Sequence, residues 1–153
     1  MRTLQSILQE YAESHQNPTN QKIHKICVPL IEFSLLGLLM CIPTPEFFHH
    51  LTWADVLVIF AIGYYAQFGN WKVIAGSFVM AFLFLSVLRL MEPNLFLPNL
   101  IIFIVAWIGQ FIGHKIEGKK PSFFKDIFFL LIGPLWVLKS ILDPLGVRLF
   151  KDQ

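Results

Sequence analysis

Long apolar runs separated by short polar breaks dominate the hydrophobic pattern of the chain. Four of these runs cover about residues 26–42, 53–68, 73–91 and 95–113. A helix needs about 17–25 residues to cross the hydrocarbon core of a bilayer, so each run comes close to spanning length, the second least so. The pattern predicts an all-α fold, a polytopic membrane bundle with about four transmembrane helices.

The breaks between these runs contain residues that favour turns. They read "CIPTPEF", "FGNWK" and "MEPNLFLP", and proline, glycine and asparagine are the residues that interrupt helices most strongly. We therefore expect tight hairpins between successive helices, with a boundary in each of these three segments.

The amino-terminal segment has a different periodicity. Leu4, Ile7, Leu8 and Tyr11 recur at the three- and four-residue spacing of one helix face, which predicts an amphipathic helix over about residues 3–14. The following "NPTN" should end it. This helix should lie on the membrane or pack on the bundle.

A fifth apolar stretch, at residues 123–142, contains Gly133-Pro134. A proline inside a helix removes a hydrogen bond and clashes with the preceding turn. The sequence therefore predicts a Gly-Pro-broken carboxyl-terminal element, interfacial or re-entrant, rather than a fifth span. Residues 1–153 together are expected to form a single integral-membrane domain.

Composition and charge agree with a membrane protein and exclude other classes. The 153 residues are 56% hydrophobic and 14% charged, with a mean hydropathy of +0.63, unlike an ordinary soluble domain. A net charge of +2 is too small for a nucleic-acid surface, so no nucleic-acid partner is expected. Neither a nucleophile-elbow serine nor a glycine-rich phosphate loop is present in the sequence, which disfavours a serine hydrolase.

Lysine and arginine lie near the amino terminus, in the loop after the second run and after the fourth run. The positive-inside rule places these regions on the inner side of the membrane. We expect a bacterial inner membrane with this side cytoplasmic, or the endoplasmic reticulum in a eukaryote. Four residues that could bind a metal then lie on the inner face: His15, His24, His114 and Glu117.

These four residues suggest a metal centre. Neutral imidazole is the commonest side-chain ligand for iron and zinc. His114 and Glu117, three residues apart on a helix, face the same way. Both could bind one ion, or one could bind the ion while the other supports that ligand by a hydrogen bond. Gln110, one turn before His114, is placed to orient it. Alternatively, the histidines bond headgroups or water, and Glu117 is a solvated partner of nearby lysines.

The chain must fold back for the first two histidines to meet. Nine residues of continuous helix would put His15 and His24 on opposite sides, and a break at Asn17-Pro18 removes that obstacle. Asn20 and His24, four residues apart on the next helix, then point in one direction.

Two blocks of the sequence resemble a known family. "YAESHQNPTNQKIHKICVPL" has a tyrosine, a histidine, Asn-x-x-Asn, a second histidine and a proline, and "WIGQFIGHKIEGKKPSFFKD" is followed by "LLIGPLWVL". Together they resemble the membrane-bound 2-hydroxy fatty acid dioxygenases typified by the yeast enzyme of phytosphingosine breakdown. The resemblance covers both ends of the chain, whereas residues 43–105 match only as hydrophobic spans.

The resemblance implies an Fe(II)-dependent dioxygenase that shortens a 2-hydroxy fatty acid by one carbon with O2, beside membrane lipid. It implies that His15, His24 and His114 hold the iron, and Glu117 belongs to the same candidate catalytic set. The residues expected at the substrate or around the ligands are Tyr11, Asn17, Asn20, Gln110, Lys119 and Lys120, the lysines by attracting a carboxylate. Two readings stay open: a membrane metal- or lipid-binding or transport protein without turnover, and a structural membrane protein.

Overall fold

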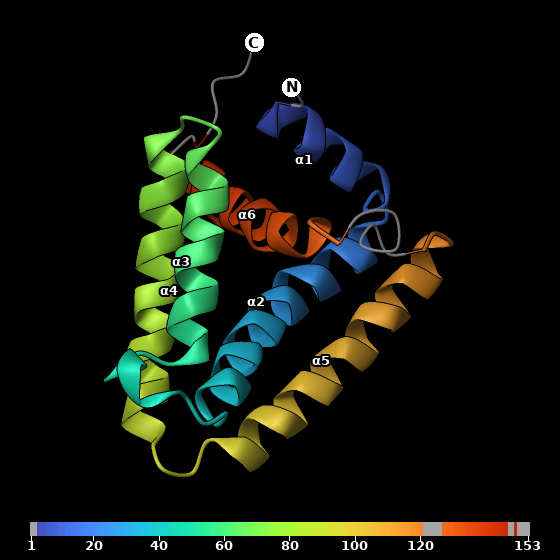
Figure 1. Ribbon diagram of the computed structural model, residues 1–153. Helices are drawn as coiled ribbons and strands as arrows, with labels where there is room; N and C mark the ends of the chain where they lie inside the picture. The colour runs from blue at the N-terminus through green and yellow to red at the C-terminus, as the bar shows by residue number, and fades with distance from the viewer. Residues whose placement is uncertain (1–2, 121–126, 147–148, 150–153) are drawn as a thin grey trace. The chain divides into compact units, whose positions relative to one another are not determined.

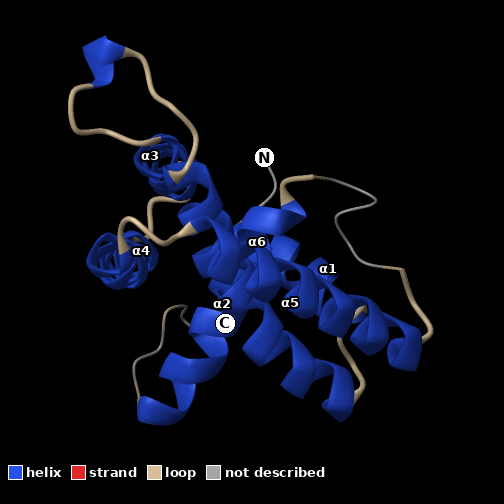
Figure 2. Cartoon of the chain, turned by 90° about the horizontal axis from the view of Figure 1, so that it is seen from below, coloured by secondary structure: helices blue, strands red, loops and turns tan. Residues whose placement is uncertain are grey.

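The computed structural model describes residues 3–120, 127–146 and 149, and within these ranges the chain is all-α (Figures 1 and 2). The predicted fold class is confirmed for this part of the chain. The helices are α1 (Leu4–Glu13), α2 (Pro18–Met40), α3 (Trp53–Ala66), α4 (Trp71–Met91), α5 (Phe96–Glu117) and α6 (Phe129–Leu142). Short 3-10 turns occupy Glu46–Phe48 and Asp143–Leu145.

The predicted amphipathic helix is confirmed as α1. Thr3 caps it by accepting a hydrogen bond from the N–H of Ser6 at 3.2 Å, which satisfies a donor that the first turn leaves unpaired. Its predicted apolar face is buried. The predicted break after it is also confirmed, because Asn17 Oδ1 accepts the N–H of Thr19 at 2.9 Å and Pro18 opens α2 at a position that needs no donor.

The hairpin boundaries fall within the predicted breaks. Thr52 and Asp55 form a capping box at the start of α3, and Asn70 accepts the N–H groups of the first turn of α4. One detail differs: Pro98, expected in a break, lies in the first turn of α5. The helix tolerates it there because first-turn N–H groups have no partner within the helix.

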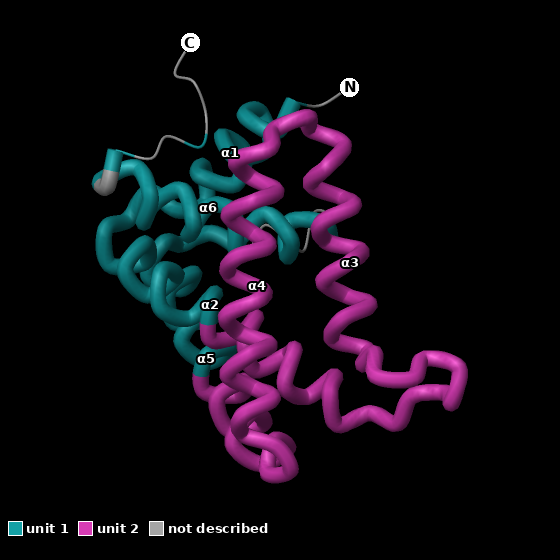
Figure 3. The backbone as a smooth tube through the Cα atoms, turned by 90° about the vertical axis from the view of Figure 1, so that its left-hand side faces the viewer, with its two compact units in different colours: residues 1–29, 106–153 teal, residues 30–105 magenta. Residues whose placement is uncertain are grey.

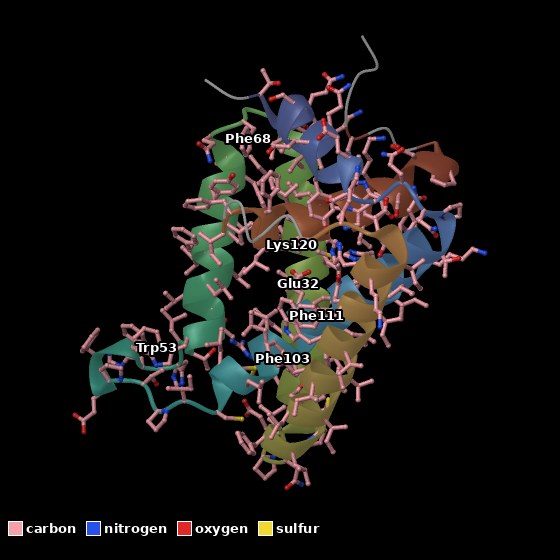
Figure 4. The ribbon with its side chains drawn as sticks, turned by 90° about the vertical axis from the view of Figure 1, so that its right-hand side faces the viewer. Glu32, Trp53, Phe68, Phe103, Phe111 and Lys120 are labelled. Carbon is pink, nitrogen blue, oxygen red and sulfur yellow. The ribbon has the colours of Figure 1, made fainter. Side chains whose placement is uncertain are left out.

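In the part of the chain that the structure describes, three helices are long and apolar enough to cross a membrane, namely α2, α4 and α5, with 23, 21 and 22 residues. Large apolar side chains stand exposed on α4 and α5, such as Leu90 at 87% and Val105 at 62%, and Figure 4 shows the side chains that project from these helices. This surface indicates membrane association. The second predicted span corresponds to α3, which has 14 residues and is shorter than the others.

The prediction that Gly133-Pro134 interrupts the carboxyl-terminal segment was wrong. Helix α6 continues from Phe129 to Leu142 with Pro134 inside it. Burial outweighs the lost hydrogen bond, because Ile132 and Leu135 on either side are fully buried. Residues 123–126 of the predicted element lie outside the described residues.

The chain forms two compact units (Figure 3). Unit 1 comprises residues 1–29 and 106–153, so it contains α1, the start of α2, the end of α5, and α6. Unit 2 comprises residues 30–105, in which α3 and α4 lie side by side around a core of Leu36, Ala54, Leu88 and Leu95. The chemistry described next lies entirely within unit 1.

Candidate metal centre

Three histidines from three different segments converge in unit 1. His15 lies in the turn after α1, His24 in the second turn of α2 and His114 in the last turn of α5. One ring nitrogen from each lies within 4.8 Å of the others. The residues are 1%, 2% and 6% exposed. The predicted meeting of these histidines is therefore seen in the structure, in a buried environment rather than at a solvated surface.

Contacts with α1 fix the ring of His15. Its Nδ1–H donates to the carbonyl oxygen of Tyr11 at 2.7 Å, and since a carbonyl only accepts, the lone pair of His15 lies on Nε2. That atom is 3.1 Å from Nδ1 of His24. Burial lowers the pKa of His15, while the bond to Tyr11 and the charge of Glu117 act in the opposite direction. The neutral imidazole is the form that binds a metal.

Two nitrogens of the cluster lack hydrogen-bond partners. Among the described residues, Nε2 of His24 and Nδ1 of His114 are buried and unpaired, and leaving such an atom unpaired costs about 1–3 kcal/mol. Ligands about 2.1 Å from an ion are at most about 4.2 Å apart, so small rotations would bring the three rings onto one ion. The residues present thus fit a metal of the kind that imidazole binds, iron or zinc among them.

Glycines let α5 approach α2 closely enough for His114 to reach His24. A Cβ atom at Gly113 would lie 2.4 Å from Oδ1 of Asn20, and one at Gly109 would lie 2.6 Å from Sγ of Cys27. Both distances are shorter than real Cβ contacts, so a larger residue at either position would force its neighbours to move. Small residues four apart are common where two helices pack closely, and here this close packing brings His114 to the histidine cluster.

Glu117 is turned toward the α1–α2 turn. Its carboxylate accepts the N–H of Gln16 at 2.8 Å, the N–H of Asn17 at 2.9 Å and Nδ2 of Asn20 at 3.0 Å. Asn20 is completely buried and also donates to the carbonyl oxygen of Ser14 at 3.3 Å. The structure thus joins three of the predicted residues, Glu117, Asn17 and Asn20, in one hydrogen-bonded group beside the histidines.

The other predicted residues have different surroundings. Tyr11 is buried with its ring stacked on His15 at 4.3 Å, and burial raises the pKa of its hydroxyl. Gln110 is buried one turn before His114, but the structure shows no hydrogen bond between these two described residues. Lys119 Nζ donates to the carbonyl oxygen of Glu13 at 2.6 Å. Lys120 is exposed (Figure 4).

Two further residues at the site were not predicted. The ring of Trp136, from α6, lies 5.5 Å from that of His15 and 5.9 Å from that of Tyr11. Gln21 holds the backbone of His15 by donating to its carbonyl oxygen at 2.8 Å. A signal for Trp136 was present in the sequence, because this residue lies in "LLIGPLWVL", part of the second block that carries the family resemblance.

Comparison with known proteins finds a matching family and a relative that carries the same description. A family model described as "2-hydroxy-palmitic acid dioxygenase Mpo1-like" matches residues 1–145. The chain is also similar to the 2-hydroxy-palmitic acid dioxygenase MPO1 of Saccharomyces cerevisiae, with 30% identity over 146 residues, covering 94% of this chain and 82% of the yeast protein. No solved structure shows significant similarity.

Proposed function

Because the chain belongs to the Mpo1-like family of 2-hydroxy-palmitic acid dioxygenases, we propose that it is an Fe(II)-dependent dioxygenase that shortens 2-hydroxy fatty acids by one carbon. The observation that carries this proposal is the buried cluster of His15, His24 and His114 with its unpaired ring nitrogens. Three buried imidazoles whose ring nitrogens lie this close together form a donor set suited to one metal ion.

His15, His24 and His114 would hold the ion. Iron(II) held by these three residues would supply the redox chemistry that a reaction with O2 requires. The chain's own contribution is orientation and exclusion of water. The Tyr11 carbonyl fixes the ring of His15, and the rings of Tyr11 and Trp136 pack against it.

The site belongs at a membrane surface in this proposal. Helices α2 and α5 are of spanning length, and His24 and His114 lie near one end of each. We assign this end to the inner, cytoplasmic side because lysines cluster around it. Since α2 and α5 each run through both compact units, we propose that the whole chain acts as one membrane domain.

The substrate would approach with its carboxylate near the lysines and its acyl chain in the apolar phase. Lys115 and Lys120 are exposed at the end of α5, where their charge can attract an anion from the membrane surface. Lys119 is less suited, because its amine already bonds the carbonyl oxygen of Glu13.

Turnover of a 2-hydroxy fatty acid tests the proposal. Protein purified in detergent and loaded anaerobically with Fe(II) should consume O2 with 2-hydroxyhexadecanoate and release a fatty acid one carbon shorter, detected by mass spectrometry. The variant His24→Ala should lose this activity. Stoichiometric iron binding without O2 consumption or a shortened product would contradict the proposal and favour a metal- or lipid-binding protein without turnover.

A further inference from the structure

Two side chains, Glu117 at the end of α5 and Lys119 just after it, form hydrogen bonds with the backbone of the turn that carries His15. We call this pair the clasp. Glu117 accepts the N–H groups of Gln16 and Asn17. Lys119 donates to the carbonyl oxygen of Glu13. The clasp therefore holds the backbone on both sides of His15.

The charges of the clasp match the helix ends that they meet. The Glu117 carboxylate lies at the amino end of α2, where unpaired N–H groups favour a negative charge. The Lys119 amine lies at the carboxyl end of α1, where unpaired carbonyl groups favour a positive charge. The two contacts run between segments more than 95 residues apart in sequence, so they are tertiary contacts rather than local capping.

The same helix end also presents His114. Glu117 follows it by three residues, so both side chains leave α5 on one face. His114 reaches the histidine cluster, where its ring is 5.1 Å from that of His15. Glu117 reaches the turn that carries His15. A shift of this turn along α5 would change the separation of the two imidazoles directly.

The hydrogen bonds of Glu117 leave little of its carboxylate for an ion. Oε1 accepts one hydrogen bond and Oε2 accepts two, at 2.8, 2.9 and 3.0 Å. The second of the Oε2 bonds comes from Asn20, a completely buried side chain that is itself held by the carbonyl oxygen of Ser14. Turning the carboxylate toward the histidines would leave an N–H of the buried Asn20 side chain without this acceptor, and a buried donor without an acceptor is unfavourable.

We propose that Glu117 is a positioning residue and not a metal ligand: it sets the distance between His15 and His114 by holding the α1–α2 turn against α5. The inference rests on the proposed function, since it takes the three histidines as the metal site. The donor set of the chain is then three neutral imidazoles. Such a set brings no negatively charged ligand to the ion, which favours an anionic, chelating substrate such as a 2-hydroxy carboxylate.

Cobalt(II) binding separates a positioning role from a ligand role, because its visible absorption spectrum depends on the atoms bound to it. The dissociation constant and the spectrum at saturation are measured in detergent for the wild type, Glu117→Gln and His114→Ala. Glu117→Gln should weaken Co(II) binding about 10- to 100-fold, as loss of a supporting partner does, with a wild-type spectrum at saturation. His114→Ala should change the spectrum. The control Glu46→Gln, the same charge change at an exposed residue of unit 2, should alter neither.

Each contrary result has a distinct meaning. A spectrum of Glu117→Gln that shifts as that of His114→Ala does would make Glu117 a ligand, and unchanged affinity would remove its positioning role. If Glu117→Gln does not fold, Asn20→Leu leaves the carboxylate in place and removes one of its donors; unchanged Co(II) affinity in that variant would also overturn the proposal. A wild type that binds no Co(II) would instead reject the metal centre, and with it the proposed function.

Discussion

Replacing Gly113 with alanine should weaken metal binding while leaving the protein folded. The added Cβ would lie 2.4 Å from Oδ1 of Asn20, whereas an ordinary contact needs about 3.4 Å, so about 1 Å of movement is required. Asn20 cannot turn away without cost, because it is completely buried and its Nδ2 bonds Glu117 and the Ser14 carbonyl. The helices α2 and α5 should separate instead.

The size of the effect follows from the cost of overpacking. Extra methyl groups in a filled interior cost about 1–3 kcal/mol. Without metal the strain is relieved by separation of the helices, but a bound ion must draw His24 and His114 together again. The strain should then appear as lost affinity, about 5- to 150-fold.

Titration with Co(II), followed by absorption, measures this loss. The matched control is Gly63→Ala, because Gly63 is also a helical glycine but has no atom within 4 Å of an added Cβ. That variant should bind Co(II) as the wild type does and gain slightly in stability. Wild-type affinity in folded Gly113→Ala would refute the idea that close approach of α2 and α5 sets the metal site.

Three further substitutions test other parts of the structure. Trp136→Phe should abolish most of the change in tryptophan fluorescence on Co(II) binding, since this ring lies 5.5 Å from that of His15; an undiminished change would place the ion elsewhere. Asp55→Asn should lower the free energy of unfolding by about 1–2 kcal/mol without altering metal affinity, because Asp55 serves the α3 cap and pairs with Arg89; denaturant unfolding in detergent checks this, and unchanged stability would contradict it. Ile132→Ala should cost about 2–5 kcal/mol because this side chain is fully buried in α6, and a thermal midpoint equal to the wild type would show that α6 packs differently.

Local patterns in the sequence were enough to predict several elements. The spacing of Leu4, Ile7, Leu8 and Tyr11 predicts α1 and its buried face, because one helix turn repeats every 3.6 residues. Asn17-Pro18 predicts the start of α2 through cap and first-turn preferences. The charge pattern placed the three site histidines on one side of the membrane, and the structure brings them together.

Features that depend on tertiary contacts were not predictable in this way. Pro134 usually ends a helix, but burial of its neighbours keeps α6 continuous. Glu117 spaced three residues from His114 suggests a shared ligand, but its partners are mainly backbone N–H groups, which no residue pattern reveals. Trp136 reaches His15 only because α6 packs on α1.

Iron content of the purified protein tests the central claim most directly. Wild type, His15→Ala, His24→Ala and His114→Ala are prepared anaerobically in detergent, reconstituted with Fe(II), and measured for metal per chain alongside circular dichroism. The three-histidine site predicts about one iron per wild-type chain and a marked loss in each folded variant. Full iron content in any one of the folded variants, or none in the wild type, would contradict it.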